Sequence, residues 1–148
     1  MADSERIRAV IFDMDGVLVD SWPMVQEGLE IACYKITGKP APLEEFRALM
    51  GLPLGAILDH LHLPQSIAPL FHELSMASSH KVTCYNGIID LLSFCRSAKI
   101  KVGVVTGKAR LRAVDIFHHT GLGTYIDCLI TPDDAPGKPD PRDRKSVV

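Results

Sequence analysis

One stretch decides the fold of this chain: Ile11-Phe12-Asp13-Met14-Asp15-Gly16-Val17-Leu18-Val19-Asp20-Ser21. The segment 8–12 that leads into it shows no alternation of polar and apolar residues, which predicts a strand buried on both faces of a parallel sheet. Such sheets bind ligands just beyond the carboxyl ends of their strands. Asp13 and Asp15 stand at that position, whereas Asp20 and Ser21 are available to cap the helix that follows. We therefore expect both carboxylates to take part in chemistry.

The composition is typical of a soluble globular domain. The 148 residues are 47% hydrophobic and 23% charged, and a chain of this length can build one ordinary domain core. The net charge of −2 offers no polybasic field, so neither nucleic acid nor an anionic membrane is an expected partner. No apolar run approaches the roughly 20 residues of a membrane span, and residues 1–6 lack the apolar segment of a signal peptide. We expect a cytoplasmic protein.

The spacing of cysteines and histidines gives no sign of a disulfide framework or a zinc site. The four cysteines are scattered without a Cys-x-x-Cys pair, which predicts free thiols. The histidines at 60 and 62 point to different faces of a helix, as do those at 118 and 119. A histidine-ligated metal is therefore not expected.

The segment that follows the motif is expected to be all-helical. Prolines near the starts and glycines near the ends indicate four helices, and their apolar residues recur at helical spacing. The first helix is expected to begin after Ser21 and to end at Gly38, and the others to cover 42–50, 53–61 and 64–79.

From about Lys81 the pattern changes to an alternation of helices and strands. A Tyr85-Asn86-Gly87 turn precedes a helix, and the apolar segment 102–105 predicts a second buried strand. A helix that ends at Gly121 and a short strand over 128–130 follow. This alternation predicts an α/β fold with a doubly wound, Rossmann-like parallel sheet.

The predicted helical segment separates the first two strands by far more chain than the dozen or so residues that a crossover requires. We therefore expect a core made of residues 1–21 and 81–142, into which residues 22–80 are inserted as a helical cap. An insertion that stands over the carboxyl ends of two strands is placed to act as a lid.

Three groups are expected to converge at one edge of the sheet. Asp13 and Asp15 follow the first strand. Thr106 ends the second strand and begins a helix, so its hydroxyl and the Gly107 amide predict an anion site supported by the helix dipole. Lys138 lies between prolines that can aim its ammonium group. Two carboxylates, an anion site and a cation together suit a phosphoryl group.

These residue types predict a mechanism. A carboxylate is ionised at neutral pH, so Asp13 can attack phosphorus without a base and form an aspartyl-phosphate. Asp15 can protonate the leaving oxygen and then take a proton from the water that hydrolyses the intermediate. Two anions that face a phosphate require a cation, and the available oxygen ligands, the Asp13 carboxylate and the Asp15 backbone carbonyl, favour Mg²⁺.

Three nearby charged residues have simpler explanations. Lys108 could touch phosphate, but a surface lysine beside a helix start is the preferred interpretation. Asp133 and Asp134 are expected to cap a turn or a helix rather than to bind a metal.

The residues 13–21 resemble the first motif of the haloacid dehalogenase (HAD) superfamily, Asp-x-Asp-Gly-[Val/Thr]-[Leu/Ile]. Thr106 at a strand end resembles the second motif, and Lys138 in Gly-Lys-Pro-x-Pro resembles the third. The position of the helical segment is similar to that in the subgroup that contains phosphoglycolate phosphatases and β-phosphoglucomutase. This resemblance implies a Mg²⁺-dependent phosphatase of a small phosphorylated metabolite, with a sugar phosphomutase as the alternative.

The chain departs from the superfamily pattern after Lys138. The fourth, acidic motif, which completes the Mg²⁺ site in the superfamily, does not follow it. Residues 143–148 have the sequence that a common sequencing adapter encodes when it is read in frame, so we expect a non-native tail on a truncated chain. An inactive fragment is therefore a further alternative, and this chain by itself is expected to have little activity.

Overall fold

Three parallel strands form the sheet that carries the sequence motif. In the computed structural model, which describes residues 6–136, β1 (Ala9–Phe12) pairs with β4 (Lys101–Val105), and β4 pairs with β5 (Cys128–Ile130). Both pairings are parallel, and the order of the strands is β1-β4-β5. The three strands predicted from their apolar runs are thereby confirmed, and their carboxyl ends lie at one edge of the sheet.

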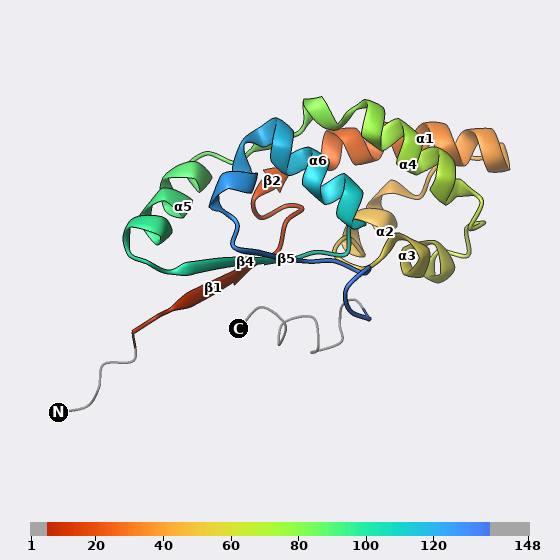
Figure 1. Cartoon of the computed structure of the whole chain (residues 1–148). Helices are drawn as coiled ribbons and strands as arrows, with labels where there is room; N and C mark the ends of the chain where they lie inside the picture. Colours follow the sequence, from red (N-terminus) through yellow and green to blue (C-terminus); the bar gives the residue numbers. More distant parts are fainter. Residues whose placement is uncertain (1–5, 137–148) are drawn as a thin grey trace.

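The central strand is buried, whereas β1 is not. β4 is buried from Val102 onwards, but Ile11 in β1 is 37% exposed and its neighbours are only partly buried. The expectation that the segment 8–12 is buried on both faces is therefore wrong for the described residues. In the view of Figure 1 no described helix lies below the sheet, and among the described strands β1 has a neighbour on one side only.

Four helices follow the motif, as predicted. They are α1 (Trp22–Thr37), α2 (Leu43–Ala48), α3 (Leu54–His60) and α4 (Ile67–Ala77). We call residues 22–77 the helical unit. α4 begins at Ile67 rather than at Pro64, and it packs along α1. The shorter α2 and α3 lie beyond the carboxyl ends of the strands (Figure 1).

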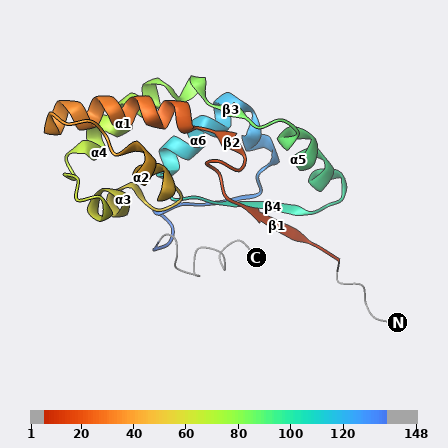
Figure 2. The ribbon, with the colours of Figure 1, turned by 180° about the vertical axis from the view of Figure 1, so that it is seen from behind.

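A two-stranded ribbon joins the two ends of the helical unit. β2 (Val19–Asp20) pairs antiparallel with β3 (Thr83–Cys84), which follows the 3₁₀-helix η1 (Ser79–Lys81). The backbone N–H of Tyr85 extends the ribbon by donating to the carbonyl of Leu18 at 3.2 Å. The sequence did not predict this ribbon, because strands of two residues carry no periodic pattern. The ribbon, seen from behind in Figure 2, holds the start of α1 beside the returning chain.

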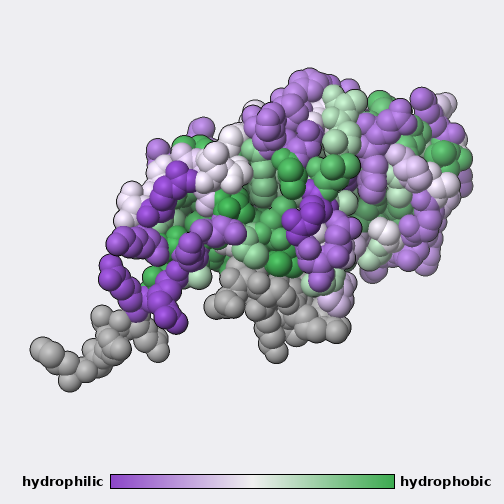
Figure 3. Space-filling view, in the orientation of Figure 1, coloured by the Kyte–Doolittle hydropathy of each residue, from purple (hydrophilic) through white to green (hydrophobic). Residues whose placement is uncertain are grey.

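Two helices connect the later strands. α5 (Ile88–Ser97) precedes β4 and packs against it, while α6 (Arg110–Thr120) and the 3₁₀-helix η2 (Leu122–Tyr125) lie between β4 and β5. The strand–helix–strand alternation confirms the α/β, Rossmann-like fold. Figure 3 shows apolar side chains gathered on the surface over α6 and β5. Val114, on α6, is 49% exposed.

One hydrophobic core runs through the sheet and the helical unit. Its fully buried members come from the motif loop, the helical unit, the central strand and α6, and include Met14, Leu29, Phe71, Val104 and Ile116. Each such side chain contributes roughly 1.5–3 kcal/mol when it is buried.

Within residues 6–136, none of the helices combines the length and the apolar character that a membrane span requires. The expected tail over 143–148 lies outside the described residues.

Candidate active site

Asp13 and Thr106 directly follow two neighbouring parallel strands. Asp13 comes after β1 and Thr106 after β4, and the register of these strands places Phe12 opposite Val104. Thr106 is 3% exposed, and its backbone N–H donates to the carbonyl of Ile130 in β5 at 3.1 Å. The structure therefore brings Asp13 and Thr106 to one edge of the sheet.

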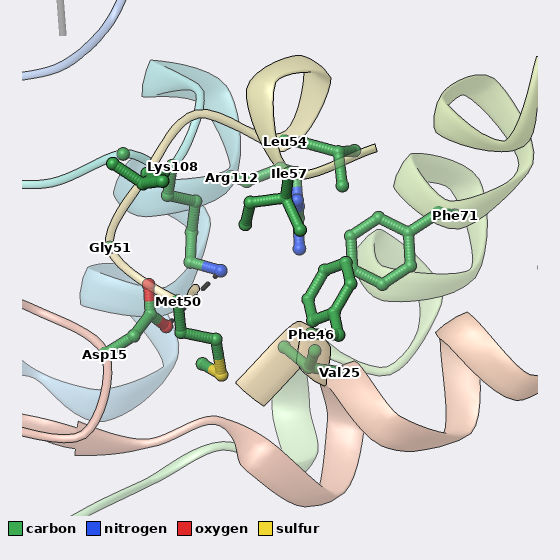
Figure 4. A pocket seen from close by; sticks show the side chains of 12 residues that line it. Asp15, Val25, Phe46, Met50, Gly51, Leu54, Ile57, Phe71, Lys108 and Arg112 are labelled. Carbon is green, nitrogen blue, oxygen red and sulfur yellow. Dashed lines mark ion pairs between the residues drawn. The ribbon is translucent and has the colours of Figure 1, made fainter. Parts of the chain in front are cut away.

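Asp15 forms a buried ion pair with Lys108. Asp15 Oδ1 lies 3.3 Å from Lys108 Nζ, and the two side chains are 11% and 5% exposed (Figure 4). The interpretation of Lys108 as a surface lysine is therefore wrong, because the turn after β4 directs its side chain toward the loop after β1. Ser21 Oγ also donates a hydrogen bond to Asp15 Oδ1.

Of the two residues predicted to cap the start of α1, Asp20 does so and Ser21 does not. Ser21 occupies the N-cap position, but its side chain makes no capping hydrogen bond, since its hydroxyl is committed to Asp15. Asp20 Oδ1 instead accepts a hydrogen bond from the backbone N–H of Trp22 at 3.3 Å. The Ser21 hydroxyl, which was expected to cap the helix, thus donates its hydrogen bond to the Asp15 carboxylate.

The carboxylate of Asp13 lies beside the loop between α2 and α3. Asp13 Oδ1 accepts a hydrogen bond from the backbone N–H of Met14 at 2.7 Å. A Cβ atom built on Gly51 would lie 3.7 Å from Asp13 Oδ2. A side chain at position 51 would therefore begin within van der Waals range of the carboxylate that the sequence predicts to be the nucleophile.

The turn after β4 differs from the predicted anion site. α6 begins at Arg110, so Thr106 does not start a helix. Thr106 Oγ1 accepts a hydrogen bond from the backbone N–H of Lys108 at 3.1 Å. The first amide of α6, that of Arg110, donates to Asp133 Oδ2 at 2.9 Å. The expected contribution of a helix dipole at Thr106 and Gly107 is therefore wrong, while the hydroxyl of Thr106 can still donate to a ligand.

Asp133 and Asp134 have the capping role that was predicted for them. Besides the bond from Arg110 to Asp133, Asp134 Oδ2 accepts hydrogen bonds from the backbone N–H and the hydroxyl of Thr131, each at 2.9 Å. The bond from the Thr131 backbone is the main reason that the pKa of Asp134 is lowered. These carboxylates stabilise the turn after β5 and the start of α6.

At Gly107 the backbones of the sheet and the helical unit nearly touch. A Cβ atom built on Gly107 would lie 2.5 Å from the carbonyl oxygens of both Gly51 and Leu52. Cβ atoms do not approach other atoms to this distance, and backbone carbonyls cannot swing away as a flexible side chain does. Glycine at 107 is therefore what allows the loop at 51–52 to rest on the turn after β4.

A cavity lies between the Asp15–Lys108 pair and the helical unit. Its volume is about 50 Å³, which is room for water-sized molecules. Asp15, Gly107, Lys108 and Arg112 line it on the side of the sheet and α6 (Figure 4). The helical unit contributes mainly apolar side chains, which are Val25, Phe46, Met50, Leu52, Leu54, Ile57 and Phe71.

Arg112 lines this cavity, and it was not predicted from the sequence. Its side chain is 7% exposed, and its Cζ lies 4.9 Å from the ring centroid of Phe71, on α4. A signal was available, because Arg112 stands beside Ala113 on the same helix as Ile116, and both of these are buried. A cation among buried apolar positions requires a partner or a ligand.

Burial and the charge of Asp15 act in opposite directions on the pKa values of both buried cations of the cavity. Burial lowers the pKa of Lys108, Asp15 opposes this shift, and Arg112 adds to it. Burial also lowers the pKa of Arg112, to about 10, again with Asp15 acting in the opposite direction. Arg112 therefore remains charged at neutral pH. The pKa of His72 is lowered by burial and by both cations, which favours its neutral form.

The described residues do not test two predicted features of the site, which are Lys138 and the Mg²⁺ ligands. Lys138 lies outside them, so its place in the site stays a prediction. Within residues 6–136 no group of three or more His, Cys, Asp or Glu side chains is arranged to hold a metal ion. The Asp13 carboxylate and the Asp15 backbone carbonyl, which the sequence predicts as Mg²⁺ ligands, therefore stay a prediction. They match the preference of Mg²⁺, which commonly takes one or two carboxylates together with substrate phosphate and water.

Two curated relatives show what this chain is similar to. It is 29% identical over 144 residues to a phosphorylated carbohydrates phosphatase of Thermotoga maritima, a match that covers 91% of this chain and 66% of the relative. It is 28% identical over 147 residues to a phosphoglycolate phosphatase of Pseudomonas putida, with 90% and 54% covered. The chain therefore spans between about half and two thirds of the length of these relatives.

A solved structure shares the fold of this chain, and a family model matches its sequence. The crystal structure of a hydrolase from Pseudomonas syringae matches 95% of this chain and 68% of its own with a TM-score of 0.82. At 20% identity this match shows the shared fold alone. The model of the haloacid dehalogenase-like hydrolases matches residues 10–147, a range that begins in β1 and includes Asp13, Asp15 and Thr106. Because this match spans nearly the whole sequence, the chain belongs to the haloacid dehalogenase-like hydrolase family.

Proposed function

We propose that this chain forms the catalytic part of a phosphatase that hydrolyses a small phosphorylated metabolite. The proposal rests on one observation: Asp13 and Thr106 meet at the carboxyl edge of the sheet, beside a cavity that holds the Asp15–Lys108 pair and Arg112. Carboxylates for nucleophilic and acid–base steps and cations for an anionic substrate are the groups that phosphoryl transfer requires. The two phosphatases to which the chain is similar support the same reaction class.

Asp13 and Asp15 each have a proposed role in the two steps of the reaction. An oxygen of the Asp13 carboxylate attacks phosphorus, the bond from phosphorus to the ester oxygen breaks, and Asp15 gives that oxygen its proton. Water then attacks the aspartyl-phosphate, Asp15 takes its proton, and inorganic phosphate leaves with Asp13 restored. Lys108 and Ser21 hold the Asp15 carboxyl group in place.

The phosphate oxygens require separate ligands. We assign to this role the hydroxyl of Thr106, the backbone amide of Gly107 and, from outside the described residues, the ammonium group of Lys138. The Asp13 carboxylate and the Asp15 backbone carbonyl would hold Mg²⁺, which supplies the positive charge that lets an anionic nucleophile approach an anionic phosphate.

The helical unit is proposed to act as a lid, as part of a cap over residues 22–80. Its loop at 51–52 rests on Gly107 and lies beside Asp13, and the cavity beneath it has a volume of about 50 Å³. Sites for small-molecule ligands typically measure about 300–1,000 Å³. The cavity is therefore small for a phosphorylated metabolite, and we infer that the helical unit moves away from the sheet to admit one. The β2–β3 ribbon is where the unit joins the core.

Gly107→Ala is expected to prevent the helical unit from closing. The added methyl group must displace the loop at 51–52, and a shift of about 1 Å near reacting groups costs on the order of 100-fold in rate. We expect kcat/KM for a phosphate ester to fall by that factor, with an unchanged circular dichroism spectrum. Gly123→Ala is the matched control, since its Cβ atom would meet its nearest neighbour at 3.7 Å. Wild-type activity in Gly107→Ala would contradict the proposed closure.

The proposed activity is tested by measuring phosphate release from an aryl phosphate in the presence of Mg²⁺. The assay should use both the 148-residue chain and the product of the complete gene, because the chain spans only part of the length of its relatives. We expect Mg²⁺-dependent turnover from the complete product and much weaker turnover from the 148-residue chain, because the Asp13 carboxylate and the Asp15 carbonyl supply only part of the octahedral coordination of Mg²⁺. If the complete product releases no phosphate from aryl phosphates, sugar phosphates or phosphoglycolate, the proposal is wrong.

The same measurement separates a phosphatase from a phosphomutase. Steady release of inorganic phosphate without a bisphosphate activator supports hydrolysis. A strict requirement for a sugar bisphosphate, with the phosphoryl group returned to a sugar, would instead establish the mutase reaction.

A further inference from the structure

Arg112 is a buried cation with an unused hydrogen-bond donor. The residue is 7% exposed, and among the described residues its buried Nη2 has no hydrogen-bond partner. Figure 4 shows its guanidinium group at the cavity, between the Asp15–Lys108 pair and the apolar wall. Burial of a charged donor without an acceptor is more costly than burial of a neutral one. Packing alone therefore does not explain an arginine at this position.

The charges around the cavity leave Arg112 without an anion of its own. The ionisable side chains that line the cavity are Asp15, Lys108 and Arg112. Asp15 is already engaged by Lys108 Nζ at 3.3 Å and by the hydroxyl of Ser21. The nearby His72 favours its neutral form. The cavity lining therefore has an excess of positive charge, and an anionic ligand would balance it.

The walls around Arg112 restrict what that ligand can be. The ring of Phe71 lies against the guanidinium group at 4.9 Å, and Phe46, Leu54 and Ile57 add further apolar surface. A guanidinium group presents a planar fork of N–H donors that matches a carboxylate better than an ammonium group does. The site therefore combines an apolar surface with a guanidinium group at one end.

We propose that Arg112 binds a carboxylate on the organic part of the substrate. The substrate is then a phosphate monoester whose carbon chain or ring carries a carboxylate at the end away from the phosphate. Asp13 and Thr106 engage the phosphate, and Arg112 engages the carboxylate across an apolar stretch. This inference rests on the proposed phosphatase function for the phosphate end of the site.

A purely structural role for Arg112 makes a different prediction. If Arg112 only joins α6 to α4 through the ring of Phe71, methionine at 112 preserves that packing and leaves ligand preference unchanged. If Arg112 binds a carboxylate, Arg112→Met and Arg112→Gln both lose the preference for a carboxylate ligand, and Arg112→Lys retains part of it because the charge remains. Ligand preference, rather than stability, therefore separates the two roles.

The test uses non-hydrolysable phosphonates of increasing chain length, each prepared with a terminal carboxylate and with the neutral, equally sized carboxamide. Isothermal titration calorimetry measures their Kd values for the complete gene product at neutral pH. The wild type is expected to bind the best carboxylate about 10- to 100-fold more tightly than its amide. This ratio should approach one in Arg112→Gln. Arg96→Gln is the control, since Arg96 packs on Tyr125 and does not line the cavity.

Each outcome decides the inference. An unchanged ratio in folded Arg112→Gln or Arg112→Met, checked by circular dichroism, overturns it, as does a wild type that binds carboxylates and amides equally. If no phosphonate binds at all, both the inference and the proposed phosphate site fail. If the carboxylate preference is found but the matching phosphate esters are not hydrolysed, the phosphatase proposal fails and the role of Arg112 stands.

Discussion

Asp13→Asn is expected to abolish formation of the phosphoenzyme in the complete gene product. The amide of asparagine has the shape of the carboxylate but lacks its charge and its nucleophilic oxygen, so no covalent intermediate can form. By analogy with the loss of other enzyme nucleophiles, turnover should fall by at least about 10⁴-fold. Rapid acid quenching after incubation with a labelled phosphate ester measures the trapped phosphoenzyme, and phosphate release measures turnover.

Asp20→Asn is the matched control for this change. Asp20 lies in the same loop and accepts a hydrogen bond from the backbone N–H of Trp22 at 3.3 Å, which the asparagine carbonyl can also accept. We expect near wild-type turnover from this variant. Covalently trapped label in Asp13→Asn would show that another residue is the nucleophile.

Asp15→Asn is expected to reduce both activity and stability. Loss of a general acid–base group typically costs about 10²- to 10⁴-fold in rate. Asp15 is also the partner of Lys108, and the two side chains are 11% and 5% exposed. Removal of one partner leaves a buried charge uncompensated, which typically costs about 3–5 kcal/mol of unfolding free energy. Initial rates and denaturant unfolding measure the two effects separately.

The stability loss in Asp15→Asn should depend on pH through Lys108. Burial lowers the pKa of Lys108 below its ordinary value of 10.5, and Asp15 opposes that shift, so the variant lowers this pKa further. Between the folded and unfolded pKa values the unfolded chain binds more protons, and stability therefore rises with pH. The deficit of the variant should be greatest below the folded pKa of Lys108 and should shrink as the pH rises from there toward 10.5. A deficit that is constant up to that pH would contradict this origin.

The double variant Asp15→Asn with Lys108→Met separates charge from packing. Methionine fills a similar volume without an ammonium group, so the uncompensated charge disappears. We expect unfolding in urea to show that most of the lost stability returns, while activity remains low because the acid–base group is still absent. A double variant that is no more stable than Asp15→Asn would show that the ion pair is not the source of the deficit.

Most of the secondary structure was predictable because it depends on residues close in the chain. The first helix ends before Gly38 and α6 ends before Gly121, as predicted. The three parallel strands match their apolar runs. Helix caps and apolar periodicity are local properties, so they can be read without knowledge of the rest of the fold. The β2–β3 ribbon was missed because its strands of two residues are specified by a pairing between distant segments.

The errors in the candidate site share a physical cause. Lys108 was interpreted as a surface residue, and Ser21 as a helix cap, from their immediate neighbours alone. In the structure both side chains turn toward Asp15. A helix dipole was expected at Thr106, but the first amide of α6 binds Asp133, which follows another strand. For Lys108 and for the start of α6, a partner that is distant in the sequence replaced the local one, and Ser21 bonds a carboxylate six residues before it.

The sequence by itself determined the succession of the parallel strands and the α-helices along the chain, the position of two aspartates after the first strand, and the chemistry that their residue types allow. Only the tertiary structure decided that Lys108 pairs with Asp15, that the loop at 51–52 rests on Gly107, and that Arg112 faces the cavity. The reason is that backbone propensities act over a few neighbouring residues, whereas burial and charge pairing depend on how the whole core packs. The aspartates and the strand ends of the site could therefore be predicted from the sequence, whereas the side chains that they contact could not.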